Sequence, residues 1–177
     1  MTECNFGYLG GPSYLKGYDV LRRALKFTRS GVTVHVTGFS QLPSDDSIGK
    51  SRVVHHVRMR RSNYERLFSK LRAVIVPSVW PEPLPYVVAE AALRARIVIA
   101  SRVGGIPELT EGCPGVFLFP PNNHVELANL IDYTSRLDGL TASRLGEENR
   151  QIMLKRLDNH SNLIRFQSLL RDAAGMR

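Results

Sequence analysis

The stretch VPSVWPEPLPYVVAEAA, residues 76–92, decides how this chain folds. It begins at the end of an apolar, β-branched run over residues 73–76, which predicts a buried strand. Prolines then break the strand into a stiff loop. Residues 86–95 contain no Gly or Pro and are rich in Ala and Val, which predicts a helix. A strand, a loop and a helix start in this order direct backbone N–H groups toward a bound anion.

The start of this predicted helix offers three backbone donors, those of Leu84, Tyr86 and Val87. Pro83 and Pro85 have no N–H, and Pro85 suits the first helical position, where the missing donor costs nothing. The positive end of the helix dipole favours a negative charge at the same place. We therefore expect these three amides to contact an anionic group of a ligand.

Two carboxylates flank the helix start: Glu82 lies just before it, and Glu90 lies on its second turn. Carboxylates accept hydrogen bonds from sugar and ribose hydroxyls. A ligand with a negative middle and hydroxyl-bearing ends, such as a nucleotide-sugar, fits this arrangement. The spacing alone leaves a second interpretation open, in which the helix dipole merely favours Glu82 and Glu90 is a solvated helix residue.

These residues resemble the group 1 glycosyltransferases, which are retaining enzymes of the GT-B fold. Glu82 and Glu90 match the E-x7-E motif of that family, and the sequence VGGIPE at residues 103–108 fits the same pattern. The resemblance runs from about Phe6 to Ile131. It covers the C-terminal, donor-binding half of a GT-B enzyme, which implies that the N-terminal, acceptor-binding half is missing from this chain.

The resemblance implies a role for each charged residue of the site. Glu82 would contact donor-sugar hydroxyls or stabilise positive charge at the sugar, and Glu90 would hold the ribose hydroxyls. Lys16 precedes Gly17 and a predicted helix over residues 18–28, and it matches the family's diphosphate-contacting lysine. Without the resemblance, a solvated lysine at the end of a loop is the better interpretation of Lys16.

The chain departs from the family at Gly10-Gly11, where Gly-Arg is usual and the arginine contacts the phosphates. We include both glycines in the predicted donor site. The basic run RMRR at residues 58–61 follows a predicted strand, and ligands bind at that end of a doubly wound sheet. Arg58 or Arg60 would replace the missing arginine. Otherwise the site is weakened or no longer catalyses, and the basic run is a solvated loop.

A pair of glycines, Gly104-Gly105, follows the predicted strand over residues 97–100. Glycines permit a close approach of backbone to another group. The pair is predicted to contact the donor, or else to form a tight turn before a short helix at residues 106–109.

Predicted strands alternate with helices along the chain, which indicates an α/β fold. We expect a Rossmann-like, doubly wound, mainly parallel six-stranded sheet with helices on both faces, the C-terminal half of a GT-B fold. Polar residues 39–50 are predicted to form a loop, Ser62 and Glu65 a capping box, and Asn122 or Asn123 a helix cap. The six predicted strands are residues 5–9, 32–37, 53–57, 73–76, 97–100 and 116–119.

The length suits a single nucleotide-sugar-binding domain over residues 1–177. Residues 138–177 are predicted to form C-terminal helices, at about 141–157 and 161–173. In GT-B enzymes the terminal helix crosses back to the N-terminal half. We therefore expect the last helix to pack on that missing half, and to be partly exposed without it.

A formal net charge of +8 favours an anionic partner: a nucleoside diphosphate, a nucleic acid or an anionic membrane face. No nucleic-acid-binding motif is present, so nucleic acid is not expected. Cys4 and Cys113 are isolated, which indicates free thiols in a reducing compartment. No signal peptide is recognised, and no apolar run reaches the roughly 20 residues that span a bilayer. A cytoplasmic location is expected, and the charge allows peripheral contact with a membrane.

Metal ligands are not apparent in the sequence. Asp45 and Asp46 are adjacent and do not form a D-x-D pair, and His55 and His56 should point to opposite faces of a strand. We expect neither a metal nor another cofactor, in agreement with the resemblance.

The predicted function is that of the donor-binding domain of a retaining glycosyltransferase, which moves a sugar from a nucleoside diphosphate sugar to an unknown acceptor. Alone, the chain should bind the donor weakly and catalyse poorly. Two alternatives remain open: a non-catalytic basic Rossmann-like binding module, and half of a GT-B sugar-nucleotide epimerase. Arginines that line the nucleotide crevice would favour the transferase, whereas a basic face away from the crevice would favour the module.

Overall fold

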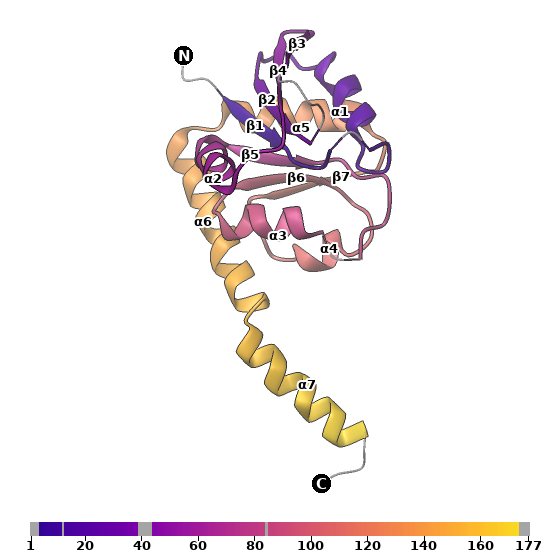
Figure 1. Cartoon of the computed structure of the whole chain (residues 1–177), viewed down its shortest axis with the longest axis vertical. Helices are drawn as coiled ribbons and strands as arrows, with labels where there is room; N and C mark the ends of the chain where they lie inside the picture. Colours follow the sequence, from indigo (N-terminus) through magenta and orange to yellow (C-terminus); the bar gives the residue numbers. More distant parts are fainter. Residues whose placement is uncertain (1–3, 12, 39–43, 84, 174–177) are drawn as a thin grey trace.

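The computed structural model describes residues 4–11, 13–38, 44–83 and 85–173, which form a seven-stranded sheet with helices around it (Figure 1). The strands are β1 (Asn5–Tyr8), β2 (Thr33–Thr37), β3 (Ser44–Ile48), β4 (Ser51–His56), β5 (Ala73–Val76), β6 (Ile97–Ser101) and β7 (Val116–Phe119). The helices are α1 (Tyr18–Leu25), α2 (Arg61–Lys70), α3 (Tyr86–Leu93), α4 (Ile106–Leu109), α5 (His124–Arg136), α6 (Gly139–Arg156) and α7 (Asn159–Ala173).

The strand order is β3-β4-β2-β1-β5-β6-β7, and every pair is parallel except β3 with β4. Strands β2, β4 and β3 lie on one side of β1, and strands β5, β6 and β7, which come later in the chain, lie on its other side. Phe6 of β1 is in register with Val34 of β2 and with Ala73 of β5. The order therefore reverses between β1 and β5, the place where doubly wound sheets bind ligands.

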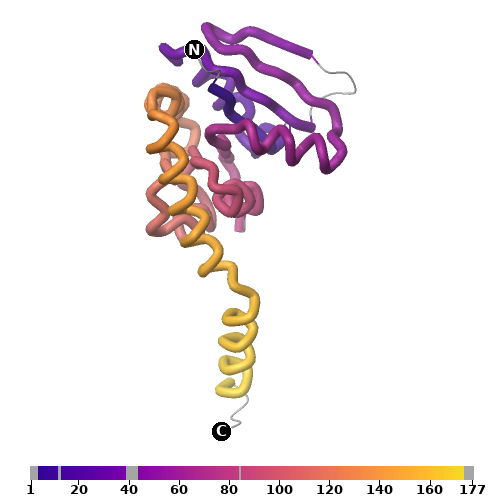
Figure 2. The backbone as a smooth tube through the Cα atoms, turned by 90° about the vertical axis from the view of Figure 1, so that its left-hand side faces the viewer, coloured from indigo at the N-terminus to yellow at the C-terminus, as the bar shows by residue number. Residues whose placement is uncertain are grey.

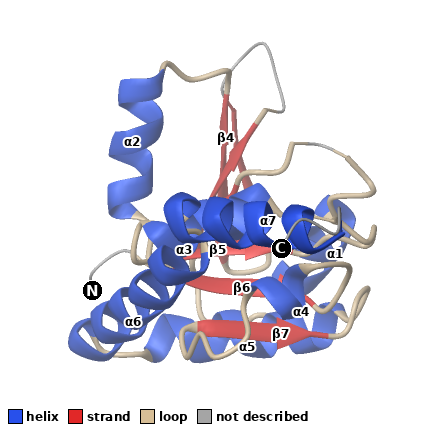
Figure 3. Cartoon of the chain, turned by 90° about the horizontal axis from the view of Figure 1, so that it is seen from below, coloured by secondary structure: helices blue, strands red, loops and turns tan. Residues whose placement is uncertain are grey.

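Helices cover both faces of the sheet, as predicted. On one face, buried residues of α1 and α5 such as Leu21 and Leu127 pack on Phe6 and Val34. On the other face, α2, α3, α4 and α6 enclose a second core that includes Phe68. Figure 1 shows α1 and α5 on the opposite side of the sheet from α3 and α4. Helix α6 lies against α3 on this second face (Figure 3).

The prediction of six strands is wrong by one, because β3 pairs antiparallel with β4 at the edge of the sheet. Its sequence SDDSI is exposed except at Ile48, so it has no apolar alternation that could signal a strand. A two-residue turn at Gly49 and Lys50, with Gly49 at φ 59°, joins the two strands. Residues 39–43 of the predicted loop lie outside the described residues.

Of the predicted helix starts, the one at α5 agrees with the structure, and those at α2 and α3 differ from it. Helix α2 begins after Arg60 with no side-chain cap, so the capping box is wrong. At α5, by contrast, Asn123 accepts the Glu126 N–H at 3.0 Å, as predicted. Pro85 is the N-cap of α3, one position before the predicted N1.

The last helix, α7, extends away from the sheet and has no buried residue (Figure 2). Its exposed apolar side chains are Leu163, Ile164, Phe166, Leu169 and Leu170. Among the helices of the described ranges, none combines the length and the apolar character that crossing a bilayer requires.

Candidate functional site

The loops after β1 and β5 meet where the strand order reverses. The amides of Val79 and Trp80 donate to the Leu15 carbonyl at 3.0 and 3.4 Å, which joins the two loops. Gly17, the N-cap of α1, has φ 75°, and a Cβ there would lie 1.8 Å from the Pro77 carbonyl oxygen. Only glycine fits both this conformation and this contact, so Gly17 sets how closely the loops approach.

The two predicted catalytic side chains form an ion pair across this junction. The Lys16 Nζ lies 2.9 Å from the Glu82 Oε2, with side chains 41% and 15% exposed. The Ser78 hydroxyl donates to the other carboxylate oxygen, Oε1, at 2.5 Å. A cavity of about 30 Å³, roughly one water molecule, adjoins the pair; it is bordered by Tyr8 and Val87 among others. The acid and the cation, far apart in sequence, therefore share one site.

Tyr8, at the end of β1, supports the loop that contains Gly10 and Gly11. Its buried hydroxyl donates to the Gly11 carbonyl at 2.8 Å and lies 3.3 Å from the Lys16 carbonyl. Burial raises the pKa of Tyr8 well above its ordinary value, so the hydroxyl remains a donor at neutral pH. Gly10 borders the same small cavity. At Gly11, with φ 72°, a Cβ would meet nothing within 4 Å beyond its chain neighbours, so the space beside it is open in the described part of the chain.

Gly104 and Gly105 contact the protein's own loop. A Cβ at Gly104, which has φ 52°, would lie 2.4 Å from the Glu82 carbonyl oxygen, and one at Gly105 would lie 2.4 Å from the Pro83 carbonyl oxygen. The Gly105 amide also donates to the Glu82 carbonyl at 2.9 Å. The close backbone approach is thus explained by support for Glu82. Direct contact of the two glycines with a donor stays a prediction.

Two of the amides predicted to contact an anion, those of Tyr86 and Val87, lie at the start of α3. Val88 donates to the Pro85 carbonyl at 2.9 Å and is the first α3 amide for which the described residues provide a backbone acceptor. Tyr86 and Val87 therefore precede the helical ladder. Tyr86 is 76% exposed, whereas Val87 is partly buried beside the small cavity. Leu84 lies outside the described residues.

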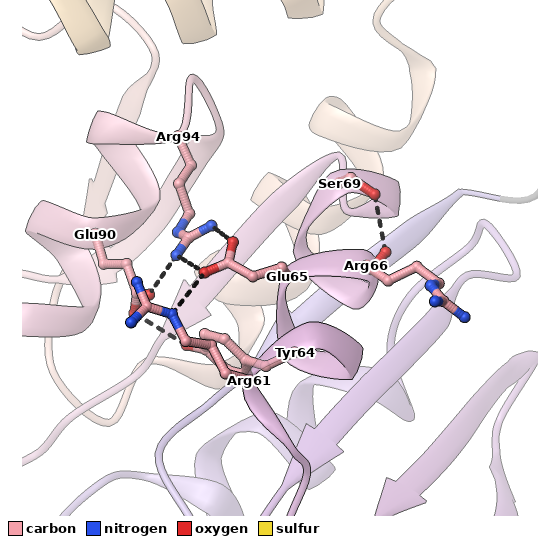
Figure 4. A network of polar contacts seen from close by, with 7 residues as sticks. All are labelled: Arg61, Tyr64, Glu65, Arg66, Ser69, Glu90 and Arg94. Atoms are coloured by element: carbon pink, nitrogen blue, oxygen red, sulfur yellow. Dashed lines mark hydrogen bonds and ion pairs between the residues drawn. The ribbon is translucent and has the colours of Figure 1, made fainter.

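Glu90 belongs to a polar network between α2 and α3 (Figure 4). The Tyr64 hydroxyl donates to its Oε2 at 2.9 Å, and the Arg94 Nη2 lies 3.2 Å from its Oε1. Arg94 also forms a two-point pair with Glu65, in which Nη2 donates to Oε1 at 2.8 Å and Nη1 to Oε2. Glu90 is therefore held in place and is not simply a solvated helix residue.

The network changes the acidity of its members. The hydrogen bond from Arg94 lowers the pKa of Glu65, and the same bond raises the pKa of Arg94. Burial, followed by the hydrogen bond to Glu90, raises the pKa of Tyr64. Glu65 and Arg94 are consequently charged, and Tyr64 neutral, across the physiological range of pH.

A larger cleft, of about 640 Å³, opens at the carboxyl ends of β2 and β4. Arg58 lines it, as predicted for the basic run. Arg60 does not; it is the N-cap of α2, and Arg61 lines the cleft instead. The cleft is bordered by Thr37, Gly38, Val57, Arg58, Met59, Arg61 and Tyr64.

Sequence reasoning missed Tyr64, Arg94 and Arg61 as site residues. Arg94 was detectable, since it stands four residues after Glu90, the spacing of helical ion pairs. The position of Tyr64 in its helix gives no sign that its hydroxyl reaches another helix. In the ranges described, no group of three or more His, Cys, Asp or Glu side chains could hold a metal ion. Metal independence stays a prediction.

Comparison with known proteins identifies the family. A family model described as "Glycosyl transferases group 1" matches residues 3–135. An uncharacterized 42.6 kDa protein in the cps region of Klebsiella pneumoniae is 26% identical over 123 residues, which cover 66% of this chain and 31% of that protein. The chain therefore spans about a third of the length of this relative.

Solved structures show the same fold. Anabaena HepE in complex with UDP superposes with a TM-score of 0.78 at 22% identity, covering 96% of this chain and 49% of that one. Sucrose-phosphate synthase from Thermosynechococcus elongatus superposes with a TM-score of 0.76 at 24% identity, covering 99% and 47%. The fold is thus one half of a GT-B glycosyltransferase. Together with the family model over residues 3–135, this places the chain in the group 1 glycosyltransferase family.

Proposed function

We propose that this chain is the donor-binding half of a retaining glycosyltransferase that transfers a sugar from a nucleoside diphosphate sugar. The observation that carries the proposal is the Lys16–Glu82 ion pair at the reversal of strand order, with Glu90 held nearby in sequence on α3. HepE has been crystallised with UDP and with UDP-glucose, which makes UDP the first nucleotide to test.

In this proposal Lys16 changes partner when the donor binds. Its half-exposed ammonium would leave Glu82 for the donor diphosphate and neutralise the charge that develops on the leaving group. A positioned charge of this kind lowers a barrier by about 2–4 kcal/mol. Glu82, still held by Ser78, would then be free to accept hydrogen bonds from the donor sugar or to stabilise positive charge there.

The remaining predicted residues would bind the rest of the donor. The amides of Leu84, Tyr86 and Val87 and the glycine loop at Gly10-Gly11 would contact the phosphates, and Glu90 would accept the ribose hydroxyls. Arg58 lines the 640 Å³ cleft and is the better candidate than Arg60 to compensate for Gly11. No metal takes part in the proposed reaction.

We further propose that an N-terminal acceptor-binding half completes the catalytic cleft. The exposed apolar side chains of α7 support this, since they would be covered by such a half. The acceptor and the linkage formed depend on that half. Residues 1–177 would then act as one domain of a two-domain enzyme.

A cytoplasmic location with peripheral contact to an anionic membrane completes the proposal. Both cysteines, Cys4 and Cys113, are free thiols, which suits a reducing compartment. Arg22, Arg23 and Lys26 on and after α1 line a hollow of about 510 Å³ together with Tyr14 and Asp19. Helix α1 lies on the opposite side of the sheet from α3, which carries Glu90 (Figure 1). Anionic headgroups attract such basic side chains.

Arg58 and Arg61 line the cleft beside Tyr64, which supports the transferase. The basic residues on and after α1 are assigned to the proposed membrane contact and not to a non-catalytic module. An epimerase half shares the fold and differs in the product, so it is distinguished by assay of the completed enzyme.

Calorimetric titration of the chain with UDP, GDP and ADP tests the proposal. We expect one of them to bind, and to bind at least about tenfold more weakly to Glu90→Ala, because hydrogen bonds to a charged acceptor are lost. Glu148→Ala removes a glutamate that pairs with Arg144 on α6, far from the site in sequence, and should leave binding unchanged. Binding that is equal in wild type and Glu90→Ala would contradict the proposal.

A further inference from the structure

The protein itself occupies part of the hydrogen-bonding capacity of Glu90. Tyr64 donates to one carboxylate oxygen and Arg94 contacts the other. An ionised carboxylate has about four lone-pair positions, so about two remain for a ligand. Two is the number that a ribose needs to donate both of its adjacent hydroxyls.

Arg94 is unusually well anchored for a helix residue paired at i,i+4. Its second pair, with Glu65 of α2, uses both ends of the guanidinium group. Its Cζ also lies 4.7 Å from the centre of the Phe68 ring. An arginine fixed by both Glu65 and Phe68 can hold the Glu90 carboxylate in one orientation, whereas a solvated arginine would move with it.

Tyr64 stands between Glu90 and the cleft. Its hydroxyl donates to Glu90, and its ring packs edge-on against Phe68 with the ring centres 5.4 Å apart. Its side chain also lines the cleft together with Arg58 and Arg61. The position of Glu90 and the shape of the cleft wall are therefore set by the same residue.

We propose that Tyr64 and Arg94 are positioning residues that orient the Glu90 carboxylate to select a nucleotide with an intact ribose diol. The inference rests on the proposed function and adds to it a basis for choosing ribose over deoxyribose. Neither residue needs to touch the reacting sugar, because both act through Glu90. Glu65 contributes one step further away, by anchoring Arg94.

The test is the ratio of dissociation constants for 2′-deoxy-UDP and UDP, measured by calorimetry on the 177-residue chain, with the ADP and GDP pairs titrated alongside. The wild-type chain should prefer the ribonucleotide by about tenfold or more. In Tyr64→Phe and in Arg94→Met this preference should fall toward one, because UDP binds more weakly while the deoxy compound is little affected. Glu65→Gln should reduce the preference less.

Matched controls separate positioning from stability. Tyr133→Phe removes a tyrosine hydroxyl from α5, where the ring packs on Phe117, and Arg144→Met breaks an i,i+4 pair on α6. Both should keep the wild-type preference. A purely structural role for Tyr64 or Arg94 would lower the unfolding midpoint and weaken both nucleotides equally, and the unchanged ratio would overturn the inference.

Failure of the proposed function gives a different result. If the folded wild-type chain binds none of the nucleotides, the proposed function fails and the positioning role fails with it. If it binds UDP with a preference that Tyr64→Phe and Arg94→Met do not alter, the proposed function stands and only the inference is overturned.

Discussion

The two acids of the predicted motif are held in different ways. Glu82 lies where two loops meet, and its cationic partner, Lys16, is a single lysine with a 41% exposed side chain. Glu90 lies between two helices, and its partner, Arg94, is itself fixed by Glu65 and Phe68. An exposed lysine readily exchanges one anion for another, whereas an anchored arginine does not. The comparison teaches that one acid is arranged to change partner and the other to keep its orientation.

The largest expected effect is on stability, and it comes from a substitution that breaks the loop junction that brings Lys16 to Glu82. Gly17→Ala would force a left-handed conformation on a residue whose Cβ meets the Pro77 carbonyl. We expect a loss of about 3 kcal/mol or more in unfolding free energy, measured by urea denaturation. Gly11→Ala has a similar φ of 72° but open space around it, so it should cost only about 1 kcal/mol. Equal losses in the two variants would show that the junction is not tightly packed.

The central architecture could be predicted from the sequence because strong local signals coincide there. The continuous apolar runs of β5 and β6 are buried on both faces, as their composition indicates. The loop prolines then end the strand and set the start of α3, which places Glu82 just before the helix and Glu90 on its second turn. Strand β3 has no such signal, because its exposed side chains do not pack and only backbone pairing with β4 defines it.

Site residues that depend on contacts between distant segments could be predicted only in part. Lys16 meets Glu82 because β1 and β5 are neighbours in the sheet, and the alternation of strands and helices in the sequence does not by itself fix that strand order. The Tyr64 hydroxyl bond to Glu90 depends on the packing angle between two helices, which no local pattern records. Glu65 was assigned to a capping box and instead pairs with Arg94, since tertiary contact replaced the local one.

An intermediate effect, on UDP affinity, is expected from the substitution that tests whether Lys16 exchanges partners. Lys16→Met should weaken UDP binding by about tenfold or more, because a charge-assisted contact to phosphate is lost. It should change the unfolding free energy by less than about 1 kcal/mol, because the pair with Glu82 is partly exposed. Lys155→Met, in the last turn of α6, is the matched control and should leave both quantities unchanged. Titration calorimetry and urea denaturation measure the two effects. A large loss of stability with unchanged UDP affinity would make Lys16 a structural residue.

The smallest expected effect is on the pH dependence of stability, and it tests the Glu65–Arg94 pair that anchors the partner of Glu90. The bond from Arg94 depresses the pKa of Glu65 below its ordinary value of 4.5 in the folded protein. The stabilisation is therefore fully present above pH 4.5 and is lost as the pH falls through the lower, folded pKa. We expect the wild-type protein to lose more stability than Glu65→Gln when urea denaturation is repeated from pH 7 down to pH 3. Because Glu65 lies at the surface, the difference in stability should be small. Glu148→Gln provides the comparison, because Glu148 forms an exposed i,i+4 pair with Arg144 on α6, and in the described part of the chain that arginine is not anchored by a second contact of this kind. Parallel pH profiles for wild type and Glu65→Gln would mean that Arg94 is not anchored by Glu65, and that both acids of the motif are held equally loosely.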